Sequence, residues 1–546
     1  MMHYPTFFWS VIVTATTLVV AATHHHHASH ATSDLTPQAA EHWIEDLPNY
    51  RDPHPISFRN FAGHLALPSN GQKMFYWFVE SQSSPEDDPL VMWLNGGPGC
   101  SSLGGFFTEL GPFVVESDLT VKLNPYAWNR KANVVFLESP AGVGFSQPVL
   151  NATDYNDDVT TDRIREFLGQ FLAAFPTLHD RPFYVTGESY AGVYVPYLVD
   201  TLLRAPVDGL ALRGLAVGNP YTDANIDGNA YMDYFYAHAL ISMENYDDMV
   251  AKCETEIGRC MFTQANCSAP CQAAVKEGLW ASDMAYFNPY YIYGDVCLLA
   301  NDQGGMLHHR KDMNIRPMHR GKIEPCTDKY TQDYLNLNDV QRAIHVDGPG
   351  LVAWSNCNMD IATTYTRSLS ALPKYHSILA QNLTVLIYSG DADAVVNFMG
   401  TERWIASDKG LHLPVQDKWK SWFGPDRQLA GYSQTYAGLT FKTVKGAGHM
   451  VPAIRPLHGL FMFECFLYGD AACATFDYPQ DNLEYLSGQV EDPVNTTAVA
   501  ASADGAHLGQ ASLLWSVGVG LVAGAAAFVA LQVMHTQARR APYHAL

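Results

Sequence analysis

Three residues of this chain, a serine, an aspartate and a histidine, follow predicted β-strands in an order that suits nucleophilic catalysis. Ser189 lies in FYVTGESYAG between a strand and a helix, a nucleophile elbow of the Gly-x-Ser-x-Gly type in which Ala191 takes the last small position. Asp391 and Asp393 follow an apolar strand in YSGDADAVVN, and His449 lies in the glycine-rich VKGAGHMVP. A serine hydroxyl needs a base to take its proton, and the base needs a carboxylate to orient it. The sequence therefore predicts a serine hydrolase.

Each of these residues also has a simpler explanation when it is taken alone. A serine before a helix usually caps it, an aspartate after a strand is usually a loop residue, and a histidine near glycine is usually just exposed. The order Ser, Asp, His at three strand ends is that of α/β-hydrolases, and a chance coincidence of all three is improbable. The residues alone leave Asp391 and Asp393 as alternatives.

The elements that must position these residues follow an alternating pattern. Apolar runs with the composition of buried strands alternate with helical periodicity, which predicts an α/β fold with a mostly parallel sheet. An early strand pair is expected within 58–81 and a one-sided apolar helix at 157–175. Further strands are expected at 89–95, 133–139, 183–187, 214–219, 383–391 and 439–449.

One segment interrupts the predicted α/β-hydrolase core. Residues 35–220 and 382–475 are expected to form its two parts, whereas 221–381 hold six of the ten cysteines and are expected to form an inserted cap. Residues 476–512 are small and polar, which is typical of a stalk.

Apolar runs also lie near both ends of the chain. Residues 7–22 predict a signal peptide over about 1–28, although no basic residue precedes the run. Residues 513–533 carry no charge and can cross about 30 Å of hydrocarbon as a helix. Arg539 and Arg540 then place the tail 534–546 in the cytosol. A lipid-anchor signal is the alternative, but its hydrophobic tail would normally end the chain.

This topology predicts a single-pass type I membrane protein of the secretory pathway. Its catalytic domain would be lumenal or extracellular, in the vacuole or lysosome, the late Golgi or at the cell surface. Four Asn-x-Ser/Thr sequons are then glycosylation candidates, each of which needs a surface position. They are Asn151, Asn266, Asn382 and Asn495.

Composition narrows the function classes. The 546 residues carry a net charge of −22, which argues against a nucleic-acid partner and suits either an acidic lumen or solubility alone. The ten cysteines favour disulfides. Their spacing lacks paired Cys-x-x-Cys motifs, so neither a metal nor another cofactor is expected. A homodimer is compatible with the sequence, which does not define the oligomeric state.

Five motifs identify a family resemblance over about residues 40–470. They are WLNGGPGCSSLGGFFTELGPF, NPYAWNRKANVVFLESPAGVGFS, PFYVTGESYAGVYVP, GDADAVVN and GAGHMVP. They resemble the serine carboxypeptidases, the group of cathepsin A, carboxypeptidase Y and the plant enzymes. The resemblance implies a triad of Ser189, Asp393 and His449, with an oxyanion hole made by the backbone N–H groups of Gly97 and Tyr190.

The resemblance also implies how a peptide C-terminus would be bound. The residues for its carboxylate would be Asn95, Gly96, Glu109 and Glu188. Two acids can face a carboxylate if they are protonated, because a neutral acid donates a hydrogen bond. Crowding raises carboxyl pKa values, so activity is expected to favour acidic pH.

The preferred C-terminal residue is less clear from the sequence. Met450 is expected to line the pocket for the departing residue, and the flanking positions are Gly104 and Thr108. No acid besides Glu109 is evident there, which favours apolar over basic leaving residues. A membrane span, however, is also found in fungal prohormone-processing carboxypeptidases, which points the other way.

The resemblance further implies a disulfide between Cys100 and Cys357. Cys465 and Cys473 could close a local loop, and the other six cysteines allow 15 connectivities. Three functional alternatives remain: an acyltransferase with the same triad, a membrane-anchored protective or binding partner without catalysis, and a lipase.

Overall fold

The computed structural model describes residues 35–262, 267–280, 287–297, 326–346, 348 and 350–479. The predicted signal peptide, the predicted span 513–533, the tail and the stalk beyond residue 479 lie outside these ranges. Within them, no helix combines the length and the apolar character that a membrane crossing requires.

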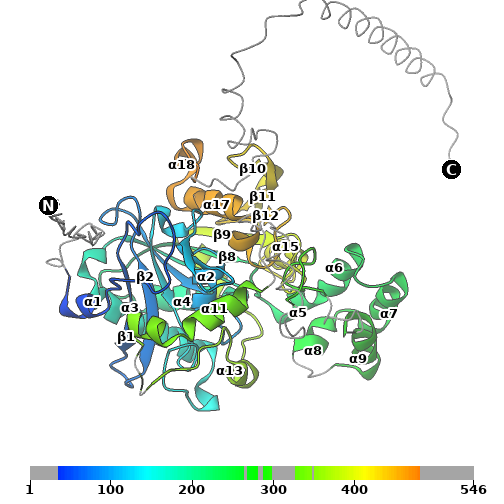
Figure 1. Cartoon of the computed structure of the whole chain (residues 1–546). Helices are drawn as coiled ribbons and strands as arrows, with labels where there is room; N and C mark the ends of the chain where they lie inside the picture. The colour runs from blue at the N-terminus through cyan, green and yellow to red at the C-terminus, as the bar shows by residue number, and fades with distance from the viewer. Residues whose placement is uncertain are drawn as a thin grey trace, which may run out of the picture. The chain divides into compact units, whose positions relative to one another are not determined.

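A mixed ten-stranded sheet forms the centre of the fold (Figure 1). Its strand order is β1-β2-β6-β3-β7-β8-β9-β12-β11-β10, and all pairings from β6 to β12 are parallel. The remaining pairings, toward both edges, are antiparallel. The strands are β1 (Asn60–Ala66), β2 (Lys73–Val79), β3 (Leu90–Leu94), β6 (Asn133–Leu137), β7 (Pro182–Glu188), β8 (Ala211–Gly218), β9 (Thr384–Gly390), β10 (Val415–Phe423), β11 (Leu429–Tyr436) and β12 (Leu439–Val444).

The expected strands are confirmed, and the described residues contain four more, β4 (Phe113–Val115), β5 (Val121–Leu123), β10 and β11. The central strands β3 and β6 are buried at every position, as expected of parallel strands covered on both faces. The hairpin of β10 and β11 was not predicted, because β10 is charged and exposed at the edge of the sheet. A separate two-stranded sheet pairs β4 with β5.

Helices cover both faces of the sheet. On one face, α3 (Asp157–Ala174) and α4 (Ala191–Arg204) bury apolar side chains in a large core cluster. On the other, α2 (Ser102–Thr108), α11 (Thr327–Leu335) and α17 (Pro456–Tyr468) pack in a second cluster. Residues from α12 (Asn338–Ala343), α13 (Met359–Thr364) and α14 (Leu372–Leu379) also join these clusters, so this part of 221–381 packs with the core.

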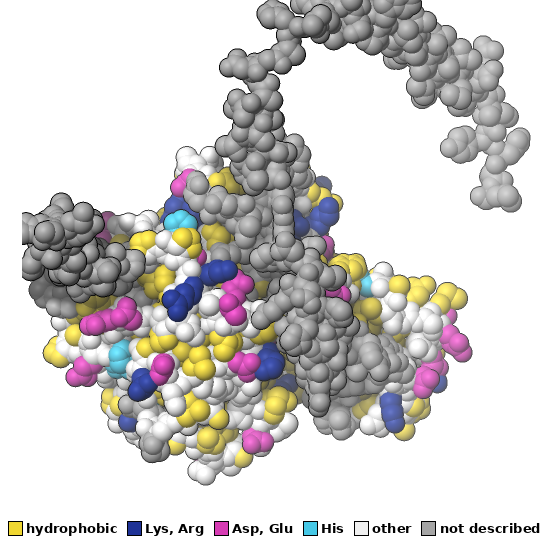
Figure 2. Space-filling view, viewed as in Figure 1, with side chains coloured by type: hydrophobic (Ala, Val, Ile, Leu, Met, Phe, Trp, Pro, Cys, Tyr) yellow, Lys and Arg dark blue, Asp and Glu magenta, His cyan; other side chains and the backbone are white. Residues whose placement is uncertain are grey.

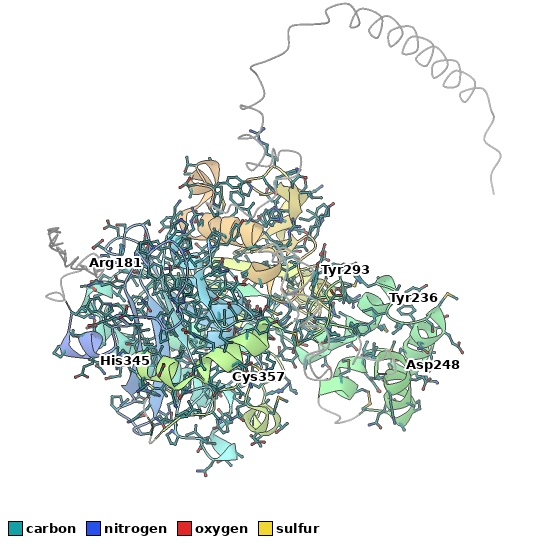
Figure 3. The ribbon with its side chains drawn as sticks, viewed as in Figure 1. Arg181, Tyr236, Asp248, Tyr293, His345 and Cys357 are labelled. Atoms are coloured by element: carbon teal, nitrogen blue, oxygen red, sulfur yellow. A yellow bond between two sulfur atoms is a disulfide. The ribbon has the colours of Figure 1, made fainter. Side chains whose placement is uncertain are left out.

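The cap helices gather beside the sheet around a small core of their own (Figure 1). They are α5 (Ala224–Asn229), α6 (Tyr231–Ala237), α7 (Met243–Cys253), α8 (Ile257–Phe262) and α9 (Ala269–Val275), followed by the short π-helix η5 (Lys276–Trp280). Figure 3 labels Tyr236 on α6 and Asp248 on α7, away from Cys357 at the core.

All ten cysteines form disulfides. The Cys100–Cys357 bond joins two segments that are 257 residues apart in the sequence, and Cys465–Cys473 closes a local loop. The six cysteines that the sequence could not pair form Cys253–Cys271, Cys260–Cys267 and Cys297–Cys326. This density of disulfides is typical of proteins that fold in the oxidising secretory pathway.

The described surface carries no concentration of basic residues on the face shown in Figure 2, where charged side chains lie scattered among polar and apolar ones. Two predicted glycosylation sites, Asn151 and Asn382, are exposed. The other two, Asn266 and Asn495, lie outside the described residues.

Candidate active site

Ser189 occupies a sharp turn between β7 and α4. Its φ of +63° lies in the left-handed region, which a side-chain-bearing residue adopts only where its surroundings impose it. Its N–H donates to the carbonyl oxygen of Gly218 (3.1 Å), and its own carbonyl oxygen accepts from the N–H of Tyr221 (2.9 Å). The turn needs small neighbours: a Cβ atom on Gly187 would lie 2.7 Å from the Cβ of Ala191. Ala191 is thus tolerated because Gly187 leaves room for it.

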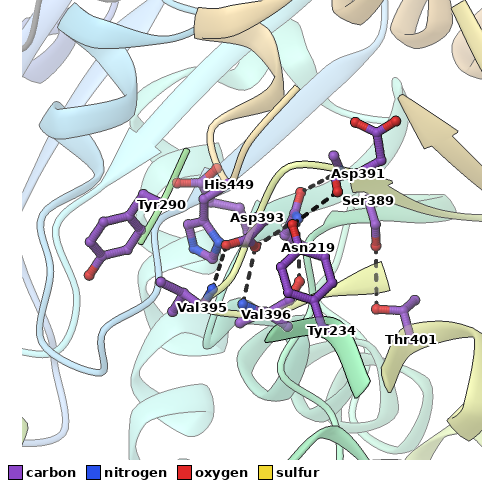
Figure 4. A network of polar contacts seen from close by, with 12 residues as sticks. Asn219, Tyr234, Tyr290, Ser389, Asp391, Asp393, Val395, Val396, Thr401 and His449 are labelled. Carbon is purple, nitrogen blue, oxygen red and sulfur yellow. Dashed lines mark hydrogen bonds and ion pairs between the residues drawn. The ribbon is translucent and has the colours of Figure 1, made fainter. Parts of the chain in front are cut away.

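The structure brings His449 and Asp393 together at the carboxyl end of the sheet (Figure 4). Nδ1 of His449 lies 2.6 Å from Oδ2 of Asp393, a carboxylate with no exposed surface. The backbone N–H groups of Val395 and Val396 donate to the same carboxylate (2.8 and 3.1 Å). With Nδ1 engaged, Nε2 is the nitrogen left for proton transfer, and it is buried without a hydrogen-bond partner in the described structure.

Asp391, the other aspartate of the motif, is engaged elsewhere. Its Oδ1 accepts from the N–H of Gly446 (2.7 Å), and its carbonyl oxygen accepts from the hydroxyl of Tyr234 (3.0 Å). Burial raises the pKa of Asp391. Geometry therefore favours Asp393 as the carboxylate that orients the histidine (Figure 4).

Two further residues complete this network, and the sequence analysis did not identify them. Asn219 follows β8, and its Nδ2 donates to Oδ2 of Asp393 (2.8 Å) while its Oδ1 accepts from Gly390 (3.1 Å). The carbonyl oxygen of Tyr290 accepts the N–H of His449 (2.6 Å), and the two rings meet edge to face at 5.2 Å. Asn219 stands at a strand end in GLAVGN and could have been found there, whereas nothing near Tyr290 signals its place.

The candidate oxyanion hole lies where the loop after β3 meets the elbow. A Cβ atom on Gly96 would lie 2.4 Å from the backbone nitrogen of Tyr190 and 2.8 Å from Cβ of Ser189, so only glycine fits. Gly97 adopts a φ of +110°. Neither the N–H of Gly97 nor that of Tyr190 donates to another group of the described residues. The Cys100–Cys357 disulfide ties this loop to the distant segment before α13.

Two buried acids lie beside the elbow and share one amide. Nδ2 of Asn95 donates to Oε1 of Glu109 (3.2 Å) and to Oε1 of Glu188 (3.0 Å). Its Oδ1 accepts from Nε1 of Trp93 (2.7 Å) and from the N–H of Gly105 (3.2 Å), which fixes the orientation of the amide. Glu109 and Glu188 are 6% and 4% exposed, and Oε2 of Glu109 has no hydrogen-bond partner in the described structure.

Burial raises the pKa of both acids. That of Glu109 rises to about 7, although hydrogen bonds from Glu188 and Asn95 oppose the change. The pKa of Glu188 is raised well above its ordinary range, by burial first and then by repulsion from the charge of Glu109. Below pH 7 Glu109 is therefore mainly neutral, and a neutral carboxyl can donate a hydrogen bond to an anion.

A third acid acts on this region electrostatically. Asp328 lies in the first turn of α11, which packs against α2, and its charge raises the pKa of both Glu109 and Tyr290. Part of the Asp328 side chain reaches solvent, but the surrounding atoms bury its carboxyl enough to raise its pKa. Met450 begins α16 (Val451–Ile454) as its N-terminal cap and is partly exposed beside His449.

The two positions considered for the leaving-residue pocket behave differently. Gly104 is buried, and a Cβ atom there would lie 2.4 Å from Oδ1 of Asn356, so it faces that residue. The hydroxyl of Thr108 donates a hydrogen bond to the carbonyl oxygen of Gly104 (2.9 Å). These positions therefore give no reason to exclude basic leaving residues.

Comparison with known proteins gives a consistent result. The family model described as serine carboxypeptidase matches residues 48–469. "Serine carboxypeptidase-like 31" of Arabidopsis thaliana is 37% identical over 452 residues, which cover 78% of this chain and 88% of that protein. "Serine carboxypeptidase-like 26" of Oryza sativa subsp. japonica is 37% identical, over 75% of this chain and 87% of the relative.

A solved structure supports the fold. The prohormone-processing carboxypeptidase KEX1(DELTA)P from Saccharomyces cerevisiae aligns with a TM-score of 0.66 over 79% of this chain and 96% of that chain, at 22% identity. At this identity the likeness shows the α/β-hydrolase fold only. Together with the family model and the plant relatives, it leads to one conclusion. The chain belongs to the serine carboxypeptidase family and is a serine-type carboxypeptidase.

Proposed function

We propose that Ser189, His449 and Asp393 are the catalytic triad of this carboxypeptidase. Nε2 of His449 takes the proton of Ser189 as Oγ attacks the last peptide carbonyl, and Asp393 stabilises the imidazolium that forms. The N–H groups of Gly97 and Tyr190 receive the negative oxygen of the tetrahedral intermediate. His449 then protonates the departing amino group, and water hydrolyses the acyl-enzyme. The 2.6 Å contact between His449 and Asp393, with Nε2 left unpartnered in the described structure, carries this proposal.

We propose that Asn95, Gly96, Glu109 and Glu188 bind the free carboxylate of the substrate. Two buried, neutral carboxyl groups joined by one amide supply donors beside the nucleophile. An internal peptide bond would present no carboxylate to them, so the arrangement selects chain ends. Because Glu109 ionises near pH 7, recognition would weaken above that pH.

We also propose that the enzyme is anchored by the span 513–533, with the catalytic domain in a lumenal or extracellular compartment. The uncharged length of the span and the basic pair after it support this topology. The disulfides agree with the secretory pathway. Removal of 513–546 should release the enzyme from alkali-washed membranes, and a truncated enzyme that remained in the membrane would contradict the anchor.

A C-terminal ladder assay tests the proposed activity. Wild-type enzyme should shorten a peptide one residue at a time at pH 5, and Ser189→Ala should not. Endoproteolytic fragments, or an unchanged ladder from Ser189→Ala, would contradict the proposal.

Three readouts address the alternatives. Transfer from an activated ester to an acceptor, without hydrolysis of a blocked dipeptide, would indicate an acyltransferase. Failure of a fluorophosphonate to label Ser189 would favour a binding partner without catalysis. Hydrolysis of lipid esters but not peptides would favour a lipase.

A further inference from the structure

A buried carboxylate below the elbow has no place in the mechanism just described. Asp157 is the first residue of α3 and is 2% exposed. Its Oδ1 and Oδ2 lie 3.2 and 3.1 Å from the hydroxyl of Tyr190. Oδ1 also accepts from the hydroxyl of Tyr365 (3.1 Å), and Oδ2 from the N–H of Ser368 (2.8 Å). The described residues supply it with no ion-pair partner, so its hydrogen bonds come from neutral donors.

Tyr190 is the residue whose backbone N–H is proposed to bind the oxyanion, and its side chain is contacted by aromatic rings, a guanidinium and a carboxylate. Its ring stacks on that of Tyr221 at 5.7 Å and meets that of Tyr194 edge to face at 5.2 Å. The guanidinium of Arg367 lies 5.7 Å from the ring centroid. The phenol is 3% exposed, and its one polar anchor in the described structure is Asp157.

We propose that Asp157 is a positioning residue for the oxyanion hole, acting through the hydroxyl of Tyr190. The aromatic neighbours fix the plane of the Tyr190 ring, and the hydrogen bond to Asp157 fixes the position of its hydroxyl end. Because the peptide N–H of Tyr190 is joined to that side chain at Cα, a hydroxyl held in place also holds the direction of the N–H. This inference rests on the proposed role of Tyr190 in catalysis.

A purely structural role is the competing explanation. An acidic residue in the first turn of a helix stabilises the helix dipole, but Asp158 already supplies an exposed charge there. A lock between α3 and residues 365–368 would need only Tyr365 and Ser368. Neither explanation requires contact with the residue that follows the nucleophile. Burial and the charge of Asp157 raise the pKa of Tyr190, so its hydroxyl remains a donor at working pH.

Two single-atom deletions distinguish these explanations. Tyr190→Phe and Tyr365→Phe each remove one hydroxyl donor from Asp157 and leave the ring. The hydroxyl of Tyr365 also contacts Oγ1 of Thr160 (2.8 Å), so Tyr365→Phe should lower the melting temperature at least as much as Tyr190→Phe. Misplacement or loss of an oxyanion donor typically lowers the rate by about a hundredfold or more. Tyr190→Phe should therefore lower kcat for a blocked dipeptide by about tenfold or more with little change in KM, whereas Tyr365→Phe should stay within about twofold of wild type.

The double variant Asp157→Asn/Tyr190→Phe should be no slower than the worse single variant, because both changes act through one contact. Equal losses of kcat in Tyr190→Phe and Tyr365→Phe, or independent effects in the double variant, would overturn the inference. If Asp157→Asn fails to fold, the comparison of the two tyrosine variants still decides. Ser189→Ala separates this result from the proposed function: if it leaves hydrolysis intact, the proposed triad fails, whatever the tyrosine variants show.

Discussion

Glu109→Gln provides the most direct test of how the enzyme recognises a chain end. The pKa of Glu109 is raised to about 7 by burial, so the neutral fraction should fall about tenfold between pH 6 and pH 8. The pKa of Glu188 is raised as well, first by burial and then by repulsion from Glu109. If Glu109 binds the substrate carboxylate only when it is neutral, the affinity for that carboxylate should fall about tenfold as well, which corresponds to about 1.4 kcal/mol.

The assay compares a blocked dipeptide that has a free carboxylate with the same dipeptide as a C-terminal amide. Both substrates use the same triad, so the ratio of their kcat/KM values cancels the ionisation of His449. In wild type this ratio should fall about tenfold from pH 6 to pH 8, and in Glu109→Gln it should be flat, because an amide donates hydrogen bonds at every pH.

Glu138→Gln is the matched control. Burial raises the pKa of Glu138 to about 7 as well, but its carboxylate accepts from Nε1 of Trp354 (2.8 Å) and the hydroxyl of Ser101, and it has no proposed contact with substrate. Its variant should keep the wild-type pH dependence. A wild-type ratio that does not change with pH, or a fall that persists in Glu109→Gln, would refute the assignment of carboxylate recognition to Glu109.

Three further outcomes can be measured. Asn219→Leu removes a hydrogen-bond donor to Asp393 and should lower kcat by about tenfold or more without changing KM. The reason is that a hydrogen bond to a buried charge is worth about 1.5–3 kcal/mol. An unchanged kcat would contradict the role of Asn219 in holding Asp393. Asp328→Asn should lower kcat/KM for peptides ending in Lys or Arg by about fivefold relative to those ending in Leu or Phe, because a lost charge–charge contact is worth about 1 kcal/mol. Equal changes for all four ends would argue that Asp328 does not face the leaving residue. The melting temperature should rise from pH 8 to pH 5. The folded-state pKa values of Glu138 and Asp227 are raised to about 7, so the folded chain binds more protons than the unfolded chain between pH 7 and about pH 4 and gains stability as the pH falls. A lower melting temperature at pH 5 would contradict this.

The sequence predicted the residues that stand directly at strand ends, because strand periodicity and glycine-rich turns are local signals. Ser189, Asp393 and His449 all belong to this kind. Asn219 also follows a strand and was missed only because an asparagine in a loop usually has no special role. The choice between the two aspartates needed either the resemblance or the structure, since a shift of two residues keeps the same side of an extended chain.

Other features could not be read from the sequence because they depend on tertiary packing. Tyr290 and Asp328 come from segments outside the strand–helix alternation, and only the folded chain brings them to Glu109 and His449. The packing of α11 to α14 on the core is of this kind as well, since the composition of 221–381 resembled a single insertion. The three disulfides of the segment 253–326 likewise required coordinates, because cysteine spacing does not encode connectivity.

The raised pKa values connect the site to the rest of the fold. Moving a buried acid from its ordinary value near 4.5 to about 7 disfavours its ionised form by about 3 kcal/mol. At pH 8 the folded chain bears this cost at Glu138 as well as at Glu109, and it also carries a net charge of −22 that opposes compaction. At pH 5 these acids are neutral and the overall charge is reduced. The protonation by which Glu109 and Glu188 are proposed to bind a carboxylate is therefore the same change that stabilises the fold, so an acidic compartment would favour recognition and stability together.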